Sequence, residues 1–228
     1  MPFSQKSLDF LLENRIMNSK LWFEEHRHIY EEHVLTPLRE LVVALEPAIH
    51  SIDPFLICEP KISRSISRIY RDTRFSRDKS IFREVMWLTF IRDRKQMLSG
   101  IPGFYFEISP AGFSYGCGCY RMAAELMDQV RQLILADDKS FLAARRAWEK
   151  QSIFTLEDTR YKRTRHPEAT EKQRLWLDQR GIILTADSGD LDTLFSPDLY
   201  KKLGEDFLLL EPVYKFLMKA ESRLIRTP

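Results

Sequence analysis

Residues 104–120, FYFEISPAGFSYGCGCY, contain the pattern that decides the fold. Two runs, 104–109 and 113–120, alternate between apolar residues and other residues, and a Pro-Ala-Gly turn joins them. Alternation with a period of two on both sides of a short turn is typical of a β-hairpin. Gly116 and Gly118 fall on one face of the second strand, so this face has no side chains at two successive positions and another group has to cover it.

The segment before the hairpin predicts a third strand. Residues 85–91, VMWLTFI, are apolar and bulky, which suits a buried strand. Because the connections are short, we expect strands 85–91, 104–109 and 113–120 to be antiparallel neighbours in one sheet. The N-terminal helices are expected to cover one face of this sheet through Trp22 and Phe23.

Helical patterns flank these strands on both sides. Apolar residues recur at helical spacing in the first fifty residues and again in the last hundred. Runs of strands flanked by runs of helices indicate an α+β fold, here an antiparallel sheet with a hairpin, packed by N-terminal and C-terminal helices. We interpret residues 1–228 as a single domain with an N-terminal helical part (1–58), an Arg-rich motif and sheet (61–120) and a C-terminal helical part (121–228).

Capping residues and breakers predict where the elements begin and end. The expected helix starts are Ser4, Asn18, Thr36-Pro37, Asp137 and Ser196-Pro197, and the expected breakers are Pro47, Pro54 and Pro60. A helix is expected from 171 to 180, stopped by Gly181, and short strands are expected at 66–70 and 182–184.

The overall composition fits a globular protein. Of the 228 residues, 44% are hydrophobic and 30% are charged, which argues against a disordered or a membrane protein. No stretch approaches the roughly 20 apolar residues of a membrane helix, and the first ten residues lack the layout of a signal peptide, so we expect no membrane partner and a cytoplasmic location. The three cysteines have no CxxC spacing, which indicates reduced thiols.

The positive charge is concentrated in residues 64–83, RSISRIYRDTRFSRDKSIFR, the Arg-rich segment. It holds seven basic side chains and two aspartates, a net charge of +5, whereas the whole chain has +2. Guanidinium groups suit phosphate and carboxylate oxygens, so the segment predicts either an anion site or a salt-bridge network that holds a loop. Asp72 and Asp78 are the catalytic candidates, although arginines lower the pKa of a neighbouring carboxylate and make it a poor acid at neutral pH.

One string within this segment is long and specific. Residues 68–79 read RIYRDTRFSRDK and resemble the hallmark of a bacterial family of conserved hypothetical proteins, domain-of-unknown-function family 2461. The other matching positions are Asn18, Trp22, Phe23, Tyr30, the hairpin 104–120 and Arg131. The chain departs from the family at residues 80–83, where Ser-Ile-Phe-Arg replaces Thr-Pro-Tyr-Lys, and at Ser19, which replaces an Asn. The family has no assigned activity, so the resemblance implies a fold and the location of a site but no reaction.

The first hypothesis is that the chain binds a small anionic ligand, phosphorylated or carboxylated, and it leaves open whether a reaction follows. The expected ligand-binding residues are Arg68, Arg71, Arg74, Arg77, Lys79, Gly116, Gly118 and Tyr120. We expect loop 71–79 to fold over the glycine face, because glycines permit close approach and the excess positive charge needs an anion or water.

Two other classes of function use the same segment. A nucleic-acid-binding module would add the basic residues of 160–165 as a second phosphate contact, and a protein-interaction module would meet an acidic partner. Nucleic acid is not the expected partner, because the charge outside the Arg-rich segment is net negative. The chain has neither GxGxxG nor HExxH, so we expect no cofactor and no metal. The oligomeric state stays open.

Overall fold

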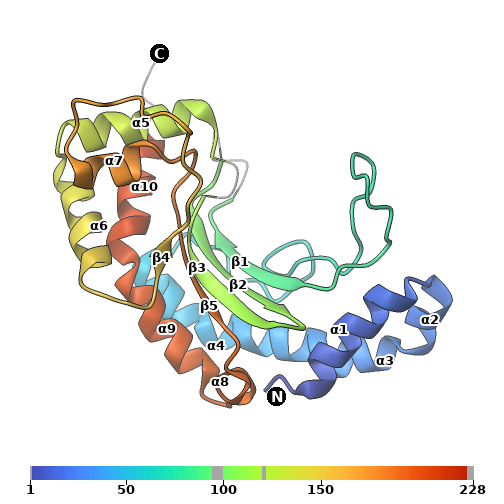
Figure 1. Ribbon diagram of the computed structural model, residues 1–228. Coiled ribbons are helices and arrows are strands. Elements are labelled where there is room, and N and C mark those ends of the chain that lie inside the picture. Colours follow the sequence, from blue (N-terminus) through green and yellow to red (C-terminus); the bar gives the residue numbers. More distant parts are fainter. Residues whose placement is uncertain (1, 94–99, 120–121, 225–228) are drawn as a thin grey trace.

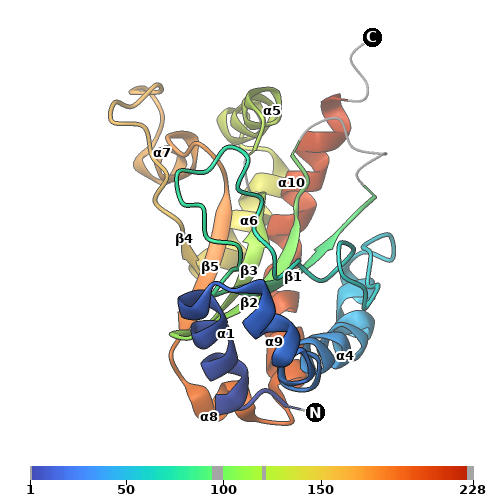
Figure 2. The ribbon, with the colours of Figure 1, turned by 90° about the vertical axis from the view of Figure 1, so that its right-hand side faces the viewer.

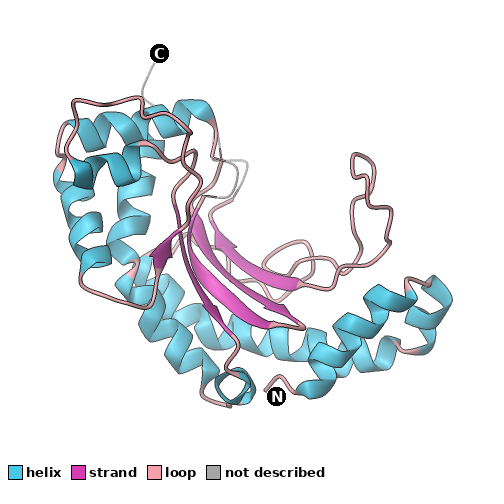
Figure 3. Cartoon of the chain, viewed as in Figure 1, coloured by secondary structure: helices cyan, strands magenta, loops and turns pink. Residues whose placement is uncertain are grey.

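A computed structural model describes residues 2–93, 100–119 and 122–224, which form a five-stranded antiparallel sheet with helices on one face and beyond its ends (Figures 1 and 3). The strands are ordered β1 (Met86–Ile91), β2 (Gly103–Ser109), β3 (Gly112–Gly118), β5 (Ile183–Ser188) and β4 (Thr155–Leu156). The α+β prediction is confirmed, as is the antiparallel order of the three predicted strands. Tyr120, at the end of the third predicted strand, lies outside the described residues.

Alternation along the strands gives the sheet one buried face and one open face. The register places Leu88, Phe106, Tyr115 and Ala186 side by side on the buried face. Helices α4 (Thr36–Ile52), α9 (Leu199–Leu209) and α10 (Glu211–Leu224) pack against this face; the ring of Phe104, for example, lies 5.3 Å from the rings of Phe207 and Tyr214. The open face is therefore the one on which polar side chains can gather.

The N-terminal helices α1 (Gln5–Met17), α2 (Lys20–Glu25) and α3 (Arg27–Tyr30) extend away from the sheet (Figure 1). The prediction that Trp22 and Phe23 cover the sheet is wrong. Phe23 stacks on Phe82 at 5.0 Å and contacts Tyr70, both from the Arg-rich segment, and Trp22 stacks on His26. These helices therefore pack on the Arg-rich segment. That segment is in turn joined to β1 by an isolated bridge between Ile66 and Leu88.

In the N-terminal part the predicted helix start at Asn18 is wrong, whereas the predicted start at Thr36-Pro37 is confirmed, because α4 begins at Thr36. Asn18 takes the left-handed conformation, with φ of 46°, and ends α1, while Ser19 caps α2 by accepting a hydrogen bond from the backbone N–H of Trp22. Asn tolerates this conformation better than most residues do. Thr36 caps no helix, because the π-helical turn η1 (Glu31–Leu35) leads directly into α4.

Two further predictions, the break at Pro47 and the cap at Asp137, also differ from the structure. Pro47 lies inside α4, where it removes one backbone hydrogen bond, but the buried stripe of Leu41, Val42, Leu45 and Ile49 holds the helix in place. Asp138 rather than Asp137 caps α6 (Lys139–Glu149), because Asp137 takes a left-handed conformation in the turn before it.

The C-terminal part contains α5 (Ala124–Leu135), α6, α7 (Glu171–Leu177), α8 (Leu191–Phe195), α9 and α10. The predicted helix 171–180 ends at Leu177, and the predicted strand 182–184 extends to Ser188 and joins the main sheet. The predicted strand 66–70 is not formed, since Ile66 and Tyr70 make only isolated bridges. Within the described ranges, no helix combines the length and the apolar character needed to cross a bilayer.

Candidate functional site

The open face carries polar and small side chains in rows that run across the strands. One row contains Trp87, Glu107, Ser114 and Asp187. The next row contains Thr89, Tyr105, Gly116 and Thr185. Because packing on the buried face stabilises the strands, the residues of the open face are free to serve a binding site.

Gly116 allows two strands and a tyrosine side chain to come close together. A Cβ atom at this position would lie 1.9 Å from the carbonyl oxygen of Leu184 on β5. Tyr105 and Thr185 flank Gly116 in register, and their hydroxyl oxygens are hydrogen-bonded at 2.7 Å, so the tyrosine crosses over the glycine. Burial raises the pKa of Tyr105 to about 12. The side chain of Tyr105 therefore covers the part of the glycine face at Gly116.

Two stretches of the Arg-rich segment, 69–71 and 81–83, pair as an antiparallel arm. Arg71 donates its backbone N–H to Ile81 at 2.8 Å, and Arg83 donates its own to Ile69 at 2.9 Å. Side chains alternate between the two faces of such an arm. Tyr70 and Phe82 pack toward Phe23 on one face, so Arg71 and Arg83 share the other face as diagonal neighbours.

The guanidinium of Arg83 lies over the open face of the sheet. Its central carbon is 4.7 Å from the centre of the Trp87 ring, a cation–π contact. Its Nε atom is buried and has no hydrogen-bond partner in the described part of the chain. Burial and the nearby charge of Arg71 lower the pKa of Arg83. No hydrogen bond or ion pair to a described residue holds the guanidinium, so its Nη donors remain available to an acceptor from outside the chain.

Glu107 is the carboxylate that lies next to Trp87 in this row. It is half-buried on β2, directly beside Trp87 in register, and it makes no hydrogen bond or ion pair with other described residues. Burial raises the pKa of Glu107, the charge of Asp187 raises it further, and Arg83 opposes both effects. Arg83 and Glu107 thus interact across the row without forming a salt bridge.

The loop between the two halves of the arm, residues 72–80, is attached to α1. Asp78 accepts a hydrogen bond from Arg15 at 2.7 Å and pairs with Arg71 at 3.1 Å. The side-chain oxygen of Asn18 accepts the backbone N–H of Ile81 at 2.7 Å. The loop stands on the side of the open face, beyond the end of the sheet (Figures 1 and 2). No hydrogen bond or ion pair among the described residues joins it to β3.

Most of the other cations predicted to bind a ligand are already hydrogen-bonded within the chain. Arg74 makes two hydrogen bonds to Asp72, at 2.9 and 2.7 Å, which occupy its fork. Arg68 donates to Ser63 and Lys79 donates to the backbone of Thr73. The exposed side chain of Arg77 has no hydrogen-bond or ion-pair partner in the described ranges.

The two catalytic candidates are exposed and ionised. Hydrogen bonds from Arg74 lower the pKa of Asp72 to about 2. Hydrogen bonds from Ser80 and the charge of Arg15 lower the pKa of Asp78 to about 2. At neutral pH both groups are carboxylates, and each already holds an arginine, so their arrangement suits the shaping of the loop better than proton transfer.

The sequence interpretation missed four residues of the open face: Arg83, Trp87, Glu107 and Asp187. A signal for two of them was present, because Trp87 alternates with the buried Met86 and Leu88, and Glu107 alternates with buried residues of its own strand. Their grouping depends on the register of β1 with β2 and of β3 with β5, which a single sequence does not contain.

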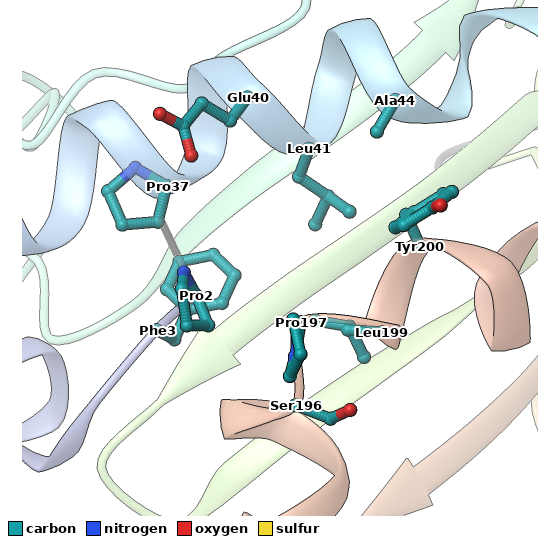
Figure 4. Close-up of a pocket in the computed structure, with 10 residues that line it drawn as sticks. All are labelled: Pro2, Phe3, Pro37, Glu40, Leu41, Ala44, Ser196, Pro197, Leu199 and Tyr200. Carbon is teal, nitrogen blue, oxygen red and sulfur yellow. The ribbon is translucent and has the colours of Figure 1, made fainter.

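Two cavities lie away from this face. The first, of about 320 Å³, lies between α4, the N-terminus and the turn from α8 to α9, and Glu40 is the only charged residue among the ten that line it (Figure 4). The second, of about 510 Å³, lies where α6 meets the start of α7. Neither contains a residue of the Arg-rich segment, and the first offers an anion no cation.

Comparison with known proteins gives one match. A family model described as "Conserved hypothetical protein (DUF2461)" matches residues 6–216. No curated protein and no solved structure matches the chain. Among the described residues, no three His, Cys, Asp or Glu side chains converge in a way that could hold a metal ion.

Proposed function

We propose that this chain, which belongs to the DUF2461 family of conserved hypothetical proteins, binds a small anionic molecule at the open face of its sheet. The ligand is phosphorylated or carboxylated, and Arg71 and Arg83 are its principal partners. The observation that carries the proposal is the guanidinium of Arg83, held over Trp87 with a buried Nε that has no acceptor among the described residues. No hydrogen bond or ion pair to a described residue holds this guanidinium, so its Nη donors can turn to an oxyanion.

The position of Arg71 supports the same proposal. It shares a face of the arm with Arg83, and one carboxylate, Asp78, serves both Arg71 and Arg15. Two neighbouring guanidinium groups repel each other unless an anion lies between them. A phosphate or carboxylate can accept hydrogen bonds from both, and such charge-assisted bonds are about twice as strong as neutral ones.

The remaining predicted cations contribute differently under this proposal. Arg68, Arg77 and Lys79 are exposed and attract an anion from a distance, whereas the fork of Arg74 is held by Asp72. Gly116 contributes by letting the backbones of β3 and β5 and the side chain of Tyr105 come close together. The alternative, a nucleic-acid or protein-interaction module, would use the exposed tip of the loop rather than the open face.

The test is a thermal-shift screen of phosphorylated and carboxylated metabolites against the wild type, Arg83→Met and Arg71→Met. At a hundredfold excess over Kd, a ligand stabilises the native state by roughly 2.7 kcal/mol, which raises Tm by about 5–10 °C. We expect both variants to lose this shift. Arg146→Met, which removes an exposed arginine on α6, is the matched control and keeps it. A full shift in Arg83→Met would overturn the proposal.

A further inference from the structure

A ligand that is only an anion does not explain the position of Glu107. It lies half-buried on β2, beside Trp87 of the edge strand, and the guanidinium of Arg83 stacks on that tryptophan instead of pairing with the carboxylate. A half-buried carboxylate without a partner is retained at a cost in stability. Its position therefore needs a reason, and a cationic group of a ligand supplies one.

A second carboxylate lies in the same row. Asp187 on β5 is separated from Glu107 on β2 by Ser114 on β3. Neighbouring strands are about 4.8 Å apart, so the two acidic residues stand about 10 Å apart at the backbone and their side chains can reach toward one point above Ser114. The serine side chain is short, and in the described part of the chain neither carboxylate has an ion-pair partner.

These charges also act against a ligand that is only anionic. An anion at Arg83 lies about two strand spacings from the point between Glu107 and Asp187, close enough to be repelled by both. An amine at that point converts the repulsion into two attractive contacts. The row then discriminates between ligands of equal negative charge by whether they also carry a cation.

Building on the proposed anion site, we propose that the ligand is an amino acid or aminoalkyl phosphate whose anionic group binds Arg83 and whose amine lies between Glu107 and Asp187. The two charged groups of the ligand are about 5–10 Å apart, the span from the edge of β1 to the space above β3. That separation selects an amine at the end of a chain over an amine next to the carboxylate.

The experiment is a titration of ω-amino carboxylates of increasing chain length and of the alkanoates of the same lengths, which lack the amine. Affinity is measured by calorimetry, and a change in tryptophan fluorescence that disappears in Trp87→Phe reports on the row itself. For the wild type we expect an optimum chain length at which the amine improves the affinity by at least about tenfold, the effect of a charged hydrogen bond. This advantage disappears in Glu107→Gln, and all binding disappears in Arg83→Met.

Glu84→Gln is the control, because it removes the same charge from an exposed position next to Arg83 and keeps the advantage of the amine. Equal affinity for compounds with and without the amine, both dependent on Arg83, would overturn this inference and leave the proposed anion site intact. The same conclusion follows if another anion binds through Arg83 and no member of the series does. A protein in which no anion binds through Arg83 would remove both proposals.

Discussion

Glu107 and Arg83 have opposite charges on one face of the sheet but form no salt bridge. No direct ion pair between them therefore offsets the free-energy cost of burying each charge. For Glu107 the consequence is a pKa above the ordinary value of 4.5, because burial and the charge of Asp187 disfavour the ionised form. The same feature makes the residue available to a ligand. Its cost is measurable in the free protein.

The first prediction concerns the pH dependence of stability. A carboxyl whose folded-state pKa is raised favours folding while it is protonated, and this contribution is lost as the pH rises from the unfolded pKa through the folded one. Glu107→Gln lacks this titration. We expect the variant to gain stability relative to the wild type as the pH rises above about 4.5. Urea unfolding of both proteins across this range measures the difference, and a difference that does not change with pH would contradict the prediction.

The second prediction concerns Gly116. Alanine at this position would place its Cβ against the backbone oxygen of Leu184, which cannot move without disturbing the pairing of β3 with β5. We expect Gly116→Ala to lower the free energy of unfolding by about 1–3 kcal/mol or more, the usual cost of overpacking. Gly189→Ala is the control, since the nearest atom to its Cβ is 3.9 Å away. Equal stability of the two variants would show that the strands can separate to accept the methyl group.

At the scale of elements, the sequence predicted the central strands because each needs only a local pattern. The alternation of residues 104–109 and 113–120 predicts a hairpin without knowledge of its surroundings. The cover of the sheet could not be predicted in this way. Phe23 has the helical spacing of a buried residue whether it packs on the strands or on another element. Only its contacts with Tyr70 and Phe82 show that it packs on the arm. The row from Trp87 to Asp187 was missed for the same reason, because long-range register brings it together.

The attachment of the loop to α1 leads to the third prediction. Asp78 joins Arg15 of α1 to the loop, whereas Asp72 pairs with Arg74 inside the loop. We expect Asp78→Asn to speed the tryptic cleavage at Arg74, Arg77 and Lys79, because the loop opens locally without unfolding of the whole chain.

Asp72→Asn is the matched control for this loop, and its cleavage rate should stay closer to that of the wild type. The Tm of both variants should remain near that of the wild type, since exposed ion pairs contribute little to global stability. Equal cleavage rates for Asp78→Asn and the wild type would show that the contact with α1 does not hold the loop.

At the scale of the whole molecule, the distribution of charge separates the possible partners. The chain has a net charge of +2, although the Arg-rich segment alone has +5. Two arginines and the lysine of that segment are already engaged with an aspartate, a serine or a backbone oxygen. The fourth prediction is therefore that nucleic acid binds weakly at physiological salt, because few phosphate contacts are available. A gel-shift titration that gives submicromolar binding to duplex or single strands, with a steep loss as salt rises, would favour the nucleic-acid alternative.

If the open face holds an oxyanion at Arg83, a crystal structure with an anion in solution should show it there. Crystals of the wild-type protein grown with sulfate or phosphate should show the anion within hydrogen-bond distance of the Arg83 guanidinium, on the side it shares with Arg71 and above Trp87. Arg83 paired directly with Glu107, with no anion at that position in saturating sulfate or phosphate, would show that the open face has no anion site at Arg83.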